Sequence, residues 1–229
     1  MDLTKRFDPP AHSGADLDLI YRARFQNQAE YRKQVWSILT DYFSRWIPPD
    51  SVLLDLGCGY CEFINQIQCS AKYGMDLNPE ARKRASPDVH ILEQDCSVTW
   101  SVPPSSLTTV FTSNFLEHLP SKTHVEKTLM HAHAALRSGG YLIAMGPNVR
   151  LVPGAYWDFF DHYVALTDSS MKEILTKCGF EVELCLGKFL PYSMSQGRTY
   201  PLWMLRAYLA MPGLWSLFGR QFLLVVRKR

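Results

Sequence analysis

Two acidic residues stand where apolar segments end, and both could bind polar groups of a ligand. Asp55 lies near the end of an apolar run that begins at Val52, and the chain turns at Gly57 and Gly59 directly afterwards. Glycines in such a turn let a ligand approach the backbone. Asp76 ends the next short apolar run, about 20 residues further along, where an acidic side chain would meet a ribose diol. The pattern therefore predicts a nucleotide-like ligand.

Two more segments carry polar residues just beyond expected strands. Asp95 and Cys96 follow a brief strand over residues 89–92. Asp95 could accept a hydrogen bond from an exocyclic amine, or it could be an ordinary surface-turn aspartate. Asn114 and Phe115 follow a β-branched strand over residues 107–112. Ligands of open α/β sheets bind beyond the carboxyl ends of the strands, so these residues are expected at one edge.

The elements that position these residues alternate between strand and helix patterns. We expect helices over residues 60–68, 79–84, 121–137 and 169–178, the last capped by Thr167 or Asp168. Gly139 and Gly140 are expected to close the third of these helices. Further strands are expected over residues 72–75, 141–145, 180–186 and 221–226. The alternation predicts a doubly wound parallel sheet with helices on both faces.

The N-terminal part of the chain does not show this alternation of strand and helix patterns. Residues 1–15 contain Pro9, Pro10 and Gly14 and no periodicity, which indicates an arm that could fold over a ligand. Residues 16–46 carry an amphipathic helical pattern that stops before Pro48. We therefore expect an N-terminal arm and helical cap over residues 1–46 and a main domain over residues 47–229, together forming a single compact unit.

Composition excludes several classes of protein. The 229 residues carry a net charge of +2, too little to favour nucleic acid as a partner. Residues 200–218 are apolar but interrupted by Arg206 and Pro212, so no membrane span is expected. They could form a substrate lid or lie on a membrane surface. The six cysteines and the absence of an apolar leader at the N-terminus indicate free thiols in the cytoplasm.

No metal ligand set is expected. Cys58 and Cys61 form a C-x-x-C pair, but no second pair follows and both fall in the glycine turn. His131 and His133 lie two residues apart on an expected helix and would diverge, so they are read as exposed or packing residues.

Five motifs resemble the class I S-adenosylmethionine-dependent methyltransferases, over essentially all of residues 45–229. They are L-D-L-G-C-G (residues 54–59), G-M-D-L-N-P (74–79), E-Q-D-C (93–96), S-N-F-L-E-H-L (113–119) and L-R-S-G-G-Y-L (136–142). The resemblance implies a Rossmann-like, seven-stranded, mostly parallel sheet whose last strand runs antiparallel. Where Cys61 stands, many relatives carry glycine. P-N-x-R (147–150), Y-W-D-F-F-D-H (156–162) and F-L-P-Y (189–192) resemble a bacterial subgroup that tailors sugars, polysaccharides or natural products.

The resemblance also implies roles in binding S-adenosylmethionine and its product S-adenosylhomocysteine. Gly57 and Gly59 would approach the amino-acid portion, with Asp55 near its ammonium group. Asp76 would hold the ribose hydroxyls. The remaining implied contacts are Leu77 on adenine, Asp95 and the Cys96 N–H at the adenine edge, and Asn114 and Phe115 at the methionyl end.

The implied activity is methyl transfer to a hydroxyl of a small molecule, for which a general base would help. Candidates near the strand ends are His162, the first choice, with His118, Asp158 and Asp161. Glu117 with His118, and Asp161 with His162, could equally be structural pairs. An aromatic-rich insertion over residues 147–167 offers Arg150, Tyr156 and Trp157 to the acceptor, and Tyr192 is a further candidate. Methylation of nitrogen or carbon, a non-catalytic partner role and a homodimer stay open.

Overall fold

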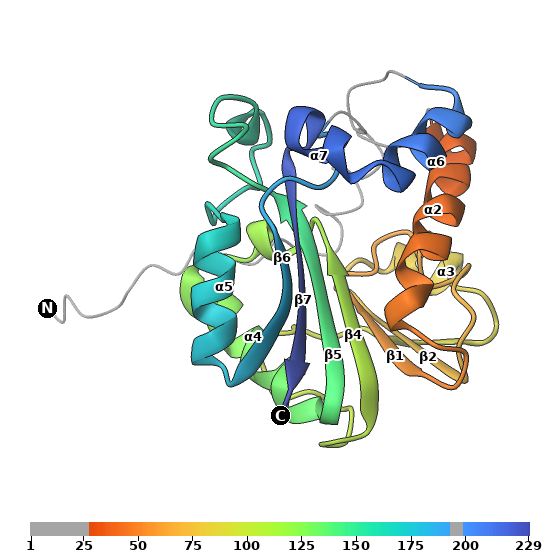
Figure 1. Ribbon diagram of the computed structural model, residues 1–229. Coiled ribbons are helices and arrows are strands. Elements are labelled where there is room, and N and C mark those ends of the chain that lie inside the picture. Colours follow the sequence, from red (N-terminus) through yellow and green to blue (C-terminus); the bar gives the residue numbers. More distant parts are fainter. Residues whose placement is uncertain (1–27, 193–198) are drawn as a thin grey trace, which may run out of the picture.

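The structure, a computed structural model, describes residues 28–192 and 199–229. Seven strands form a mixed sheet in the order β3-β2-β1-β4-β5-β7-β6 (Figure 1). The strands are β1 (Val52–Leu56), β2 (Ala71–Met75), β3 (Val89–Leu92), β4 (Leu107–Ser113), β5 (Leu136–Pro147), β6 (Phe180–Leu186) and β7 (Gln221–Lys228).

One strand of the sheet, β7, runs opposite to its neighbours. The pairs β1 with β2, β1 with β4, β2 with β3 and β4 with β5 are parallel. β7 lies between β5 and β6 and runs antiparallel to both. The predicted mostly parallel, Rossmann-like sheet with an antiparallel last strand is therefore confirmed.

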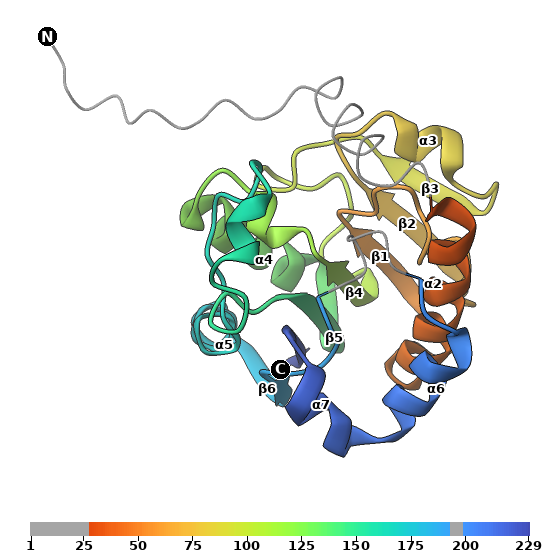
Figure 2. The ribbon, with the colours of Figure 1, turned by 90° about the horizontal axis from the view of Figure 1, so that it is seen from above.

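Helices cover both faces of the sheet (Figure 2). One face carries α4 (Lys122–Ala135) and α5 (Asp168–Lys177), and their apolar side chains pack on residues such as Leu142 and Leu224. The other face carries α2 (Ala29–Phe43), α3 (Glu80–Arg84), α6 (Leu202–Ala210) and α7 (Pro212–Phe218). Neighbouring strand residues such as Ile143 and Val225 point to that side. Successive side chains of a strand point to opposite faces of the sheet, so the strands contribute to two separate hydrophobic cores.

The helix expected over residues 60–68 is absent, and that expectation is wrong. The segment forms turns in which the Asn65 and Ile67 N–H groups donate to the carbonyls of Cys61 and Phe63 at 3.0 and 3.2 Å. Cys61 is buried with φ of 61°, a left-handed conformation that no α-helical residue adopts. The apolar positions still pack, because the ring of Phe63 stacks on Phe111 at 3.9 Å.

The helix expected to reach Arg137 ends earlier. α4 stops at Ala135, and β5 begins at Leu136, which pairs with Leu107 of β4. Leu136 is fully buried, so strand pairing and burial override the helical pattern. Gly139 and Gly140 consequently lie within β5 rather than closing a helix. β5 is correspondingly longer than the five residues expected.

Several expected features lie outside the described residues. These are the arm over residues 1–15 and the first part of the amphipathic segment over residues 16–27. The described part of that segment forms α2 and a short 3₁₀ helix, η2 (Ser44–Trp46). The tail over residues 200–218 forms α6 and α7. Among the described residues, no helix has the length and apolar character needed to span a membrane.

Candidate active site

Three strand ends bring the predicted ligand-binding residues to one edge of the sheet. β2, β1 and β4 are neighbours, and their register places Asp55 beside Gly74 and Phe111. Asp76 and Asn114 directly follow β2 and β4 at this edge. Asp55 and Asp76 are both buried. The parallel strand order therefore assembles the acidic pair from residues far apart in sequence.

The glycine turn is tied to the end of β2. The Gly57 and Cys58 N–H groups donate to the Met75 carbonyl at 2.8 and 3.2 Å. The Gly59 N–H donates to Asp76 Oδ2 at 2.7 Å, and the Asn78 N–H donates to Asp76 Oδ1 at 2.8 Å. The carboxylate still has lone-pair capacity left that can accept from a ligand hydroxyl.

Gly57 lies directly under the ring of Phe115. Its φ is 75°, and a Cβ built on it would lie 2.2 Å from Phe115 Cγ. Both the backbone conformation and the ring therefore demand glycine here. Gly57, predicted at the amino-acid portion of the ligand, is thus in contact with Phe115, predicted at its methionyl end. Asn114 also adopts a left-handed conformation, with φ of 49°, and its N–H donates to the Met145 carbonyl.

The acidic pair is electrostatically unfavourable by itself. Burial raises the pKa of Asp55 well above its usual range, and repulsion from Asp76 and Glu62 adds to the effect. Burial also raises the pKa of Asp76, while hydrogen bonds from the backbone of Asn78, Gly59 and Leu77 oppose that shift. A ligand that brings positive charge would relieve both carboxylates.

The opposite end of this edge combines an apolar surface with polar groups. Leu77 is 37% exposed although it is a large apolar residue. Asp95 Oδ1 accepts from the Ser97 N–H at 2.8 Å. Cys96 is buried, and its carbonyl accepts from the Trp100 indole at 2.7 Å. An exposed aliphatic side chain beside a carboxylate suits one face and one edge of an aromatic base.

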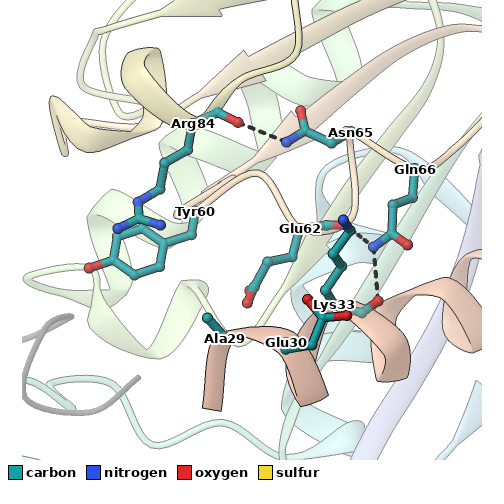
Figure 3. A pocket seen from close by; sticks show the side chains of 8 residues that line it. All are labelled: Ala29, Glu30, Lys33, Tyr60, Glu62, Asn65, Gln66 and Arg84. Atoms are coloured by element: carbon teal, nitrogen blue, oxygen red, sulfur yellow. Dashed lines mark hydrogen bonds between the residues drawn. The ribbon is translucent and has the colours of Figure 1, made fainter. Parts of the chain in front are cut away.

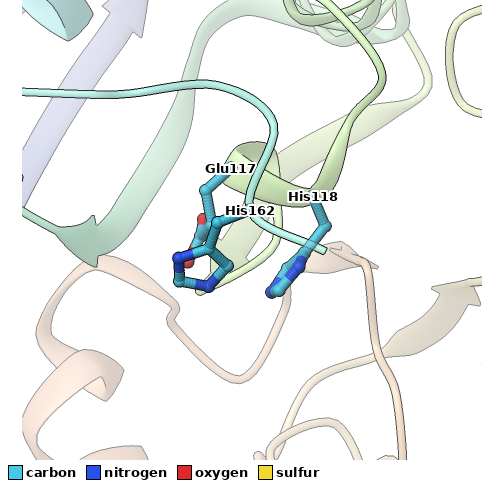
Figure 4. Close-up of side chains that lie close together, drawn as sticks. All are labelled: Glu117, His118 and His162. Carbon is cyan, nitrogen blue, oxygen red and sulfur yellow. The ribbon is translucent and has the colours of Figure 1, made fainter. Parts of the chain in front are cut away.

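A second cluster lies on the segment that continues from Asn114. Glu117 and His118 belong to the 3₁₀ helix η3 (Leu116–His118), and His162 comes from the aromatic-rich insertion after β5 (Figure 4). Ligand-type atoms of these three side chains lie within 4.8 Å of one another. His118 Nδ1 lies 3.1 Å from Asp161 Oδ2 and 3.0 Å from the Asp161 carbonyl oxygen.

Backbone contacts hold the cluster together. The Tyr163 and Val164 N–H groups donate to the Glu117 carbonyl at 2.9 and 3.1 Å. Glu117 and His162 are buried. Burial raises the pKa of the Glu117 carboxyl, and the neighbouring His118 opposes that shift. The cluster is therefore a group of proton-binding side chains next to the ligand edge, two of them buried and His118 half-buried.

A sequence model described as a methyltransferase domain matches residues 28–184, well over half of the chain. The chain belongs to this methyltransferase family. Comparison with curated proteins gave no match.

Solved structures share the fold of this methyltransferase. A chain from the complex between the Haloferax volcanii Trm112 methyltransferase activator and a methyltransferase has a TM-score of 0.68 at 16% identity, covering 93% of this chain and 97% of that chain. An S-adenosylmethionine-dependent methyltransferase from Archaeoglobus fulgidus has a TM-score of 0.61 at 20% identity, covering 84% and 94%. One from Thermotoga maritima, described as a possible histamine N-methyltransferase, has a TM-score of 0.62 at 16% identity, covering 93% and 100%. The family match and these neighbours support S-adenosylmethionine as the cofactor.

Of the other residues predicted for the methyltransferase site, Tyr156 contacts the cluster, because its ring lies 4.5 Å from that of His162, whereas Asp158, Trp157 and Arg150 are not part of it. Asp158 and Trp157 are exposed on the 3₁₀ helix η4 (Ala155–Asp158). Arg150 reaches the start of α5, where its Nη2 donates to Ser169 Oγ at 3.3 Å. Tyr156 is fully buried, and its hydroxyl donates to the Val164 carbonyl. Tyr156 thus supports the insertion from inside.

The structure adds one pair to those considered from the sequence. Asp161 pairs with His118, whose Nδ1 lies 3.1 Å from Asp161 Oδ2. Glu117 is not among the predicted acid or base groups, although its position shortly after a buried strand and before a histidine is a signal for it. Tyr192 lies near the insertion, with its ring 6.2 Å from that of Phe159.

A separate surface cavity of 340 Å³ lies between the start of α2, the glycine turn and the end of α3 (Figure 3). The Arg84 guanidinium stacks on the Tyr60 ring at 3.9 Å, and Asn65 donates to the Arg84 carbonyl at 2.8 Å. Its lining includes none of the residues predicted to bind the cofactor. This cavity is therefore distinct from the acidic edge.

Proposed function

We propose that this methyltransferase transfers the methyl group of S-adenosylmethionine to a hydroxyl of a small molecule such as a sugar, a glycan or a natural product. The observation that carries the proposal is the cluster of Glu117, His118 and His162, in which Glu117 and His162 are buried and His118 is half-buried. It continues directly from Asn114 and Phe115, the residues expected at the methionyl end of the cofactor. A hydroxyl is a weak nucleophile, and an adjacent imidazole can accept its proton.

The charge of the strand-end acids fits the same cofactor. S-adenosylmethionine carries a sulfonium and an ammonium group, and the buried pair Asp55 and Asp76 gains from a cation. Asp76 would accept from the ribose hydroxyls, and Leu77 would pack against adenine. Asp95 and the Cys96 N–H would read the adenine edge.

The reaction is an in-line displacement in which the protein chiefly aligns the two partners and excludes water. The acceptor oxygen forms a bond to the methyl carbon while the bond from that carbon to sulfur breaks. His162 takes the hydroxyl proton, and S-adenosylhomocysteine leaves. His118, oriented by Asp161 at 3.1 Å, supports the imidazole of His162 at a ring separation of 4.7 Å.

The acceptor would rest on the aromatic insertion. Trp157 is 56% exposed and offers a flat apolar face to a sugar or an aromatic ring. Arg150 and Tyr192 stand at the other predicted positions of this surface, and Asp158 would be a second polar group at its rim. Tyr156 keeps the insertion in place from beneath.

The first experiment is calorimetric titration of the purified protein with S-adenosylhomocysteine. We expect saturable binding of one molecule per chain. Absence of binding at millimolar ligand would overturn the proposal.

The second experiment screens hydroxyl, amine and carbon acceptors with methyl-labelled cofactor. On a confirmed hydroxyl acceptor, His162→Ala should lower kcat by about 100-fold or more, with little change in the affinity for S-adenosylhomocysteine. His131→Ala on α4 is the matched control and should keep full activity. An unchanged rate in His162→Ala removes His162 as the base, and labelling of amines or carbon acids alone favours the alternative N- or C-methylation.

An apolar face offers the other alternative, a non-catalytic cofactor-binding partner. Trp203, Leu217 and Phe218 on α6 and α7 are 68%, 64% and 57% exposed. A stable hetero-complex or a homodimer in size-exclusion light scattering, together with cofactor binding and no turnover, would favour that role. Binding to vesicles through residues 200–218 would indicate peripheral membrane contact. The six free thiols suit a cytoplasmic protein.

A further inference from the structure

We propose that Glu117, His118 and His162 bind one divalent transition-metal ion of the Zn²⁺ class. One carboxylate and two imidazoles form a three-ligand set that leaves a coordination position open for an exchangeable ligand. Figure 4 shows the three side chains converging from η3 and from the insertion.

The distances suit this ligand set. The candidate ligand atoms all lie within 4.8 Å of one another. Ligands bonded to a tetrahedral Zn²⁺ at 2.0–2.1 Å lie roughly 3.4 Å apart. Side-chain adjustments of about one ångström therefore close the site around an ion.

Asp161 orients one of the ligands. The His118 Nδ1–H donates to the buried Asp161, whose Oδ2 lies 3.1 Å away. This hydrogen bond favours the tautomer in which Nε2 carries the lone pair. A carboxylate behind an imidazole is the usual outer partner of a metal-binding histidine.

The backbone and the surrounding rings restrict the ligands further. Hydrogen bonds from Tyr163 and Val164 to the Glu117 carbonyl join η3 to the insertion. The His162 ring is stacked on Phe159 at 5.0 Å and contacts Tyr156 at 4.5 Å. Short segments locked in this way hold the side chains close to a binding geometry.

Charge also favours a cation. Glu117 is 2% exposed, and no lysine or arginine within residues 28–192 and 199–229 forms an ion pair with it. Asp161 adds a second buried carboxylate at the same place. Buried carboxylates are stable when they are paired or coordinate a metal, and a divalent ion would balance the charge of Glu117.

The sequence predicts no metal site because neither the cysteine pair nor the α4 histidines form a ligand set, and the proposed site uses none of these residues. Cys58 Sγ and Cys61 Sγ lie 4.0 Å apart, but they belong to no cluster of three metal-binding residues in the described part of the chain. The cluster found draws its ligands from two segments distant in sequence, so spacing along the chain could not show it.

The catalytic role of the ion, unlike its binding, rests on the proposed function. The acceptor hydroxyl would take the open position, where the metal lowers its pKa and the proton passes to solvent. The oxygen then attacks the methyl carbon as the carbon–sulfur bond breaks. In this state His162 is a ligand and the ion replaces it as the group that activates the hydroxyl.

The test measures metal binding without acceptor or cofactor. The protein, prepared without a histidine tag, is stripped with a chelator and titrated with Zn²⁺ by calorimetry and with Co²⁺ by visible absorption. We expect one ion per chain. Glu117→Gln, His118→Ala and His162→Ala should each weaken binding at least about 10-fold, and Asp161→Asn about 10- to 100-fold. His131→Ala should bind as the unaltered protein does.

Two measurements keep the result decisive. Zinc-edge X-ray absorption of the unaltered protein should show two imidazole ligands and no sulfur, whatever the stability of the variants. No binding by the unaltered protein, sulfur ligation, or unchanged binding in the His118→Ala/His162→Ala double variant overturns the site.

Turnover on a confirmed hydroxyl acceptor should fall after stripping and return with Zn²⁺. An unchanged rate overturns the catalytic role alone, and failure to bind S-adenosylhomocysteine overturns the proposed function alone.

Discussion

Asp55 occupies the least favourable electrostatic position among the strand-end residues. It lies in the interior strand β1, between β2 and β4, and is 4% exposed, with Asp76 and Glu62 as acidic neighbours. A raised pKa in the folded state means that the folded protein binds a proton more readily than the unfolded chain. The contribution of Asp55 to stability is therefore largest in acid and is lost as pH rises through the folded-state pKa.

Asp55→Asn tests the predicted direction in which the contribution of Asp55 to stability changes with pH. In the absence of cofactor, the variant should have a higher urea midpoint than the unaltered protein at about pH 8, because a buried charge is removed. The difference should shrink toward about pH 5. Asp50→Asn, at an exposed position before β1, should show no such trend. A lower midpoint for Asp55→Asn at the higher pH would contradict the argument.

Among the elements, α5 has a fully formed N-terminal cap. Thr167 Oγ1 accepts from the Ser170 N–H at 3.0 Å, and Ser170 Oγ accepts from the Thr167 N–H at 2.9 Å. This capping box satisfies two backbone N–H groups. It also fixes the start of the helix, whose Met171 and Leu175 are buried against the sheet.

Thr167→Ala should lower the free energy of unfolding by about 1 kcal/mol, since the cap side chain is lost. Urea denaturation followed by far-UV circular dichroism measures the change. Thr176→Ala is the control on the same helix, because the exposed Thr176 hydroxyl only donates to the Lys172 carbonyl. Equal destabilisation by the two substitutions would show that the cap has no special role.

The elements also show what the sequence could and could not predict. Strand over residues 180–186 was predictable to the residue, because β-branched and apolar residues there follow a helix-ending glycine. The strand-end acids followed from the same logic, since parallel strands bring their ends together. The turns over residues 60–68 were not predictable, because their helical spacing of apolar residues is satisfied by packing Phe63 on Phe111 without a helix.

The cluster of Glu117, His118 and His162 could not be predicted from the sequence, for a related reason. His118 and His162 were each candidates for a base, but their proximity depends on how the insertion returns to η3 through the Tyr163 and Val164 hydrogen bonds. No local pattern encodes that return. The pairing of Asp161 with His118 depends on the same contact.

At the scale of the whole molecule, the sheet separates two cores that share its strands. Leu129 on α4 is fully buried in one, and Leu39 on α2 is fully buried in the other. Adjacent residues of β7 face opposite sides, with Leu224 in the first core and Val225 in the second. Loss of either core therefore exposes one face of the same strands.

Leu129→Ala and Leu39→Ala should each destabilise the protein by about 2–5 kcal/mol, the usual cost of a buried leucine truncation. Both should shift one common transition when unfolding is followed by tryptophan fluorescence and by circular dichroism. Leu217→Ala, at a residue 64% exposed, should change stability by less than about 0.5 kcal/mol. Separate transitions by the two probes would show that the cores unfold independently.

The place of β7 between β5 and β6 has a consequence for synthesis of the chain. β6 leaves the ribosome before β7, yet its partner in the sheet is β7 and not β5. Until β7 emerges, the nascent chain therefore exposes the edge of β5 and an unpaired β6, a state open to aggregation. Closure of the sheet must then proceed by insertion of a late strand between two earlier ones, so the nascent protein would gain most from a chaperone at that stage.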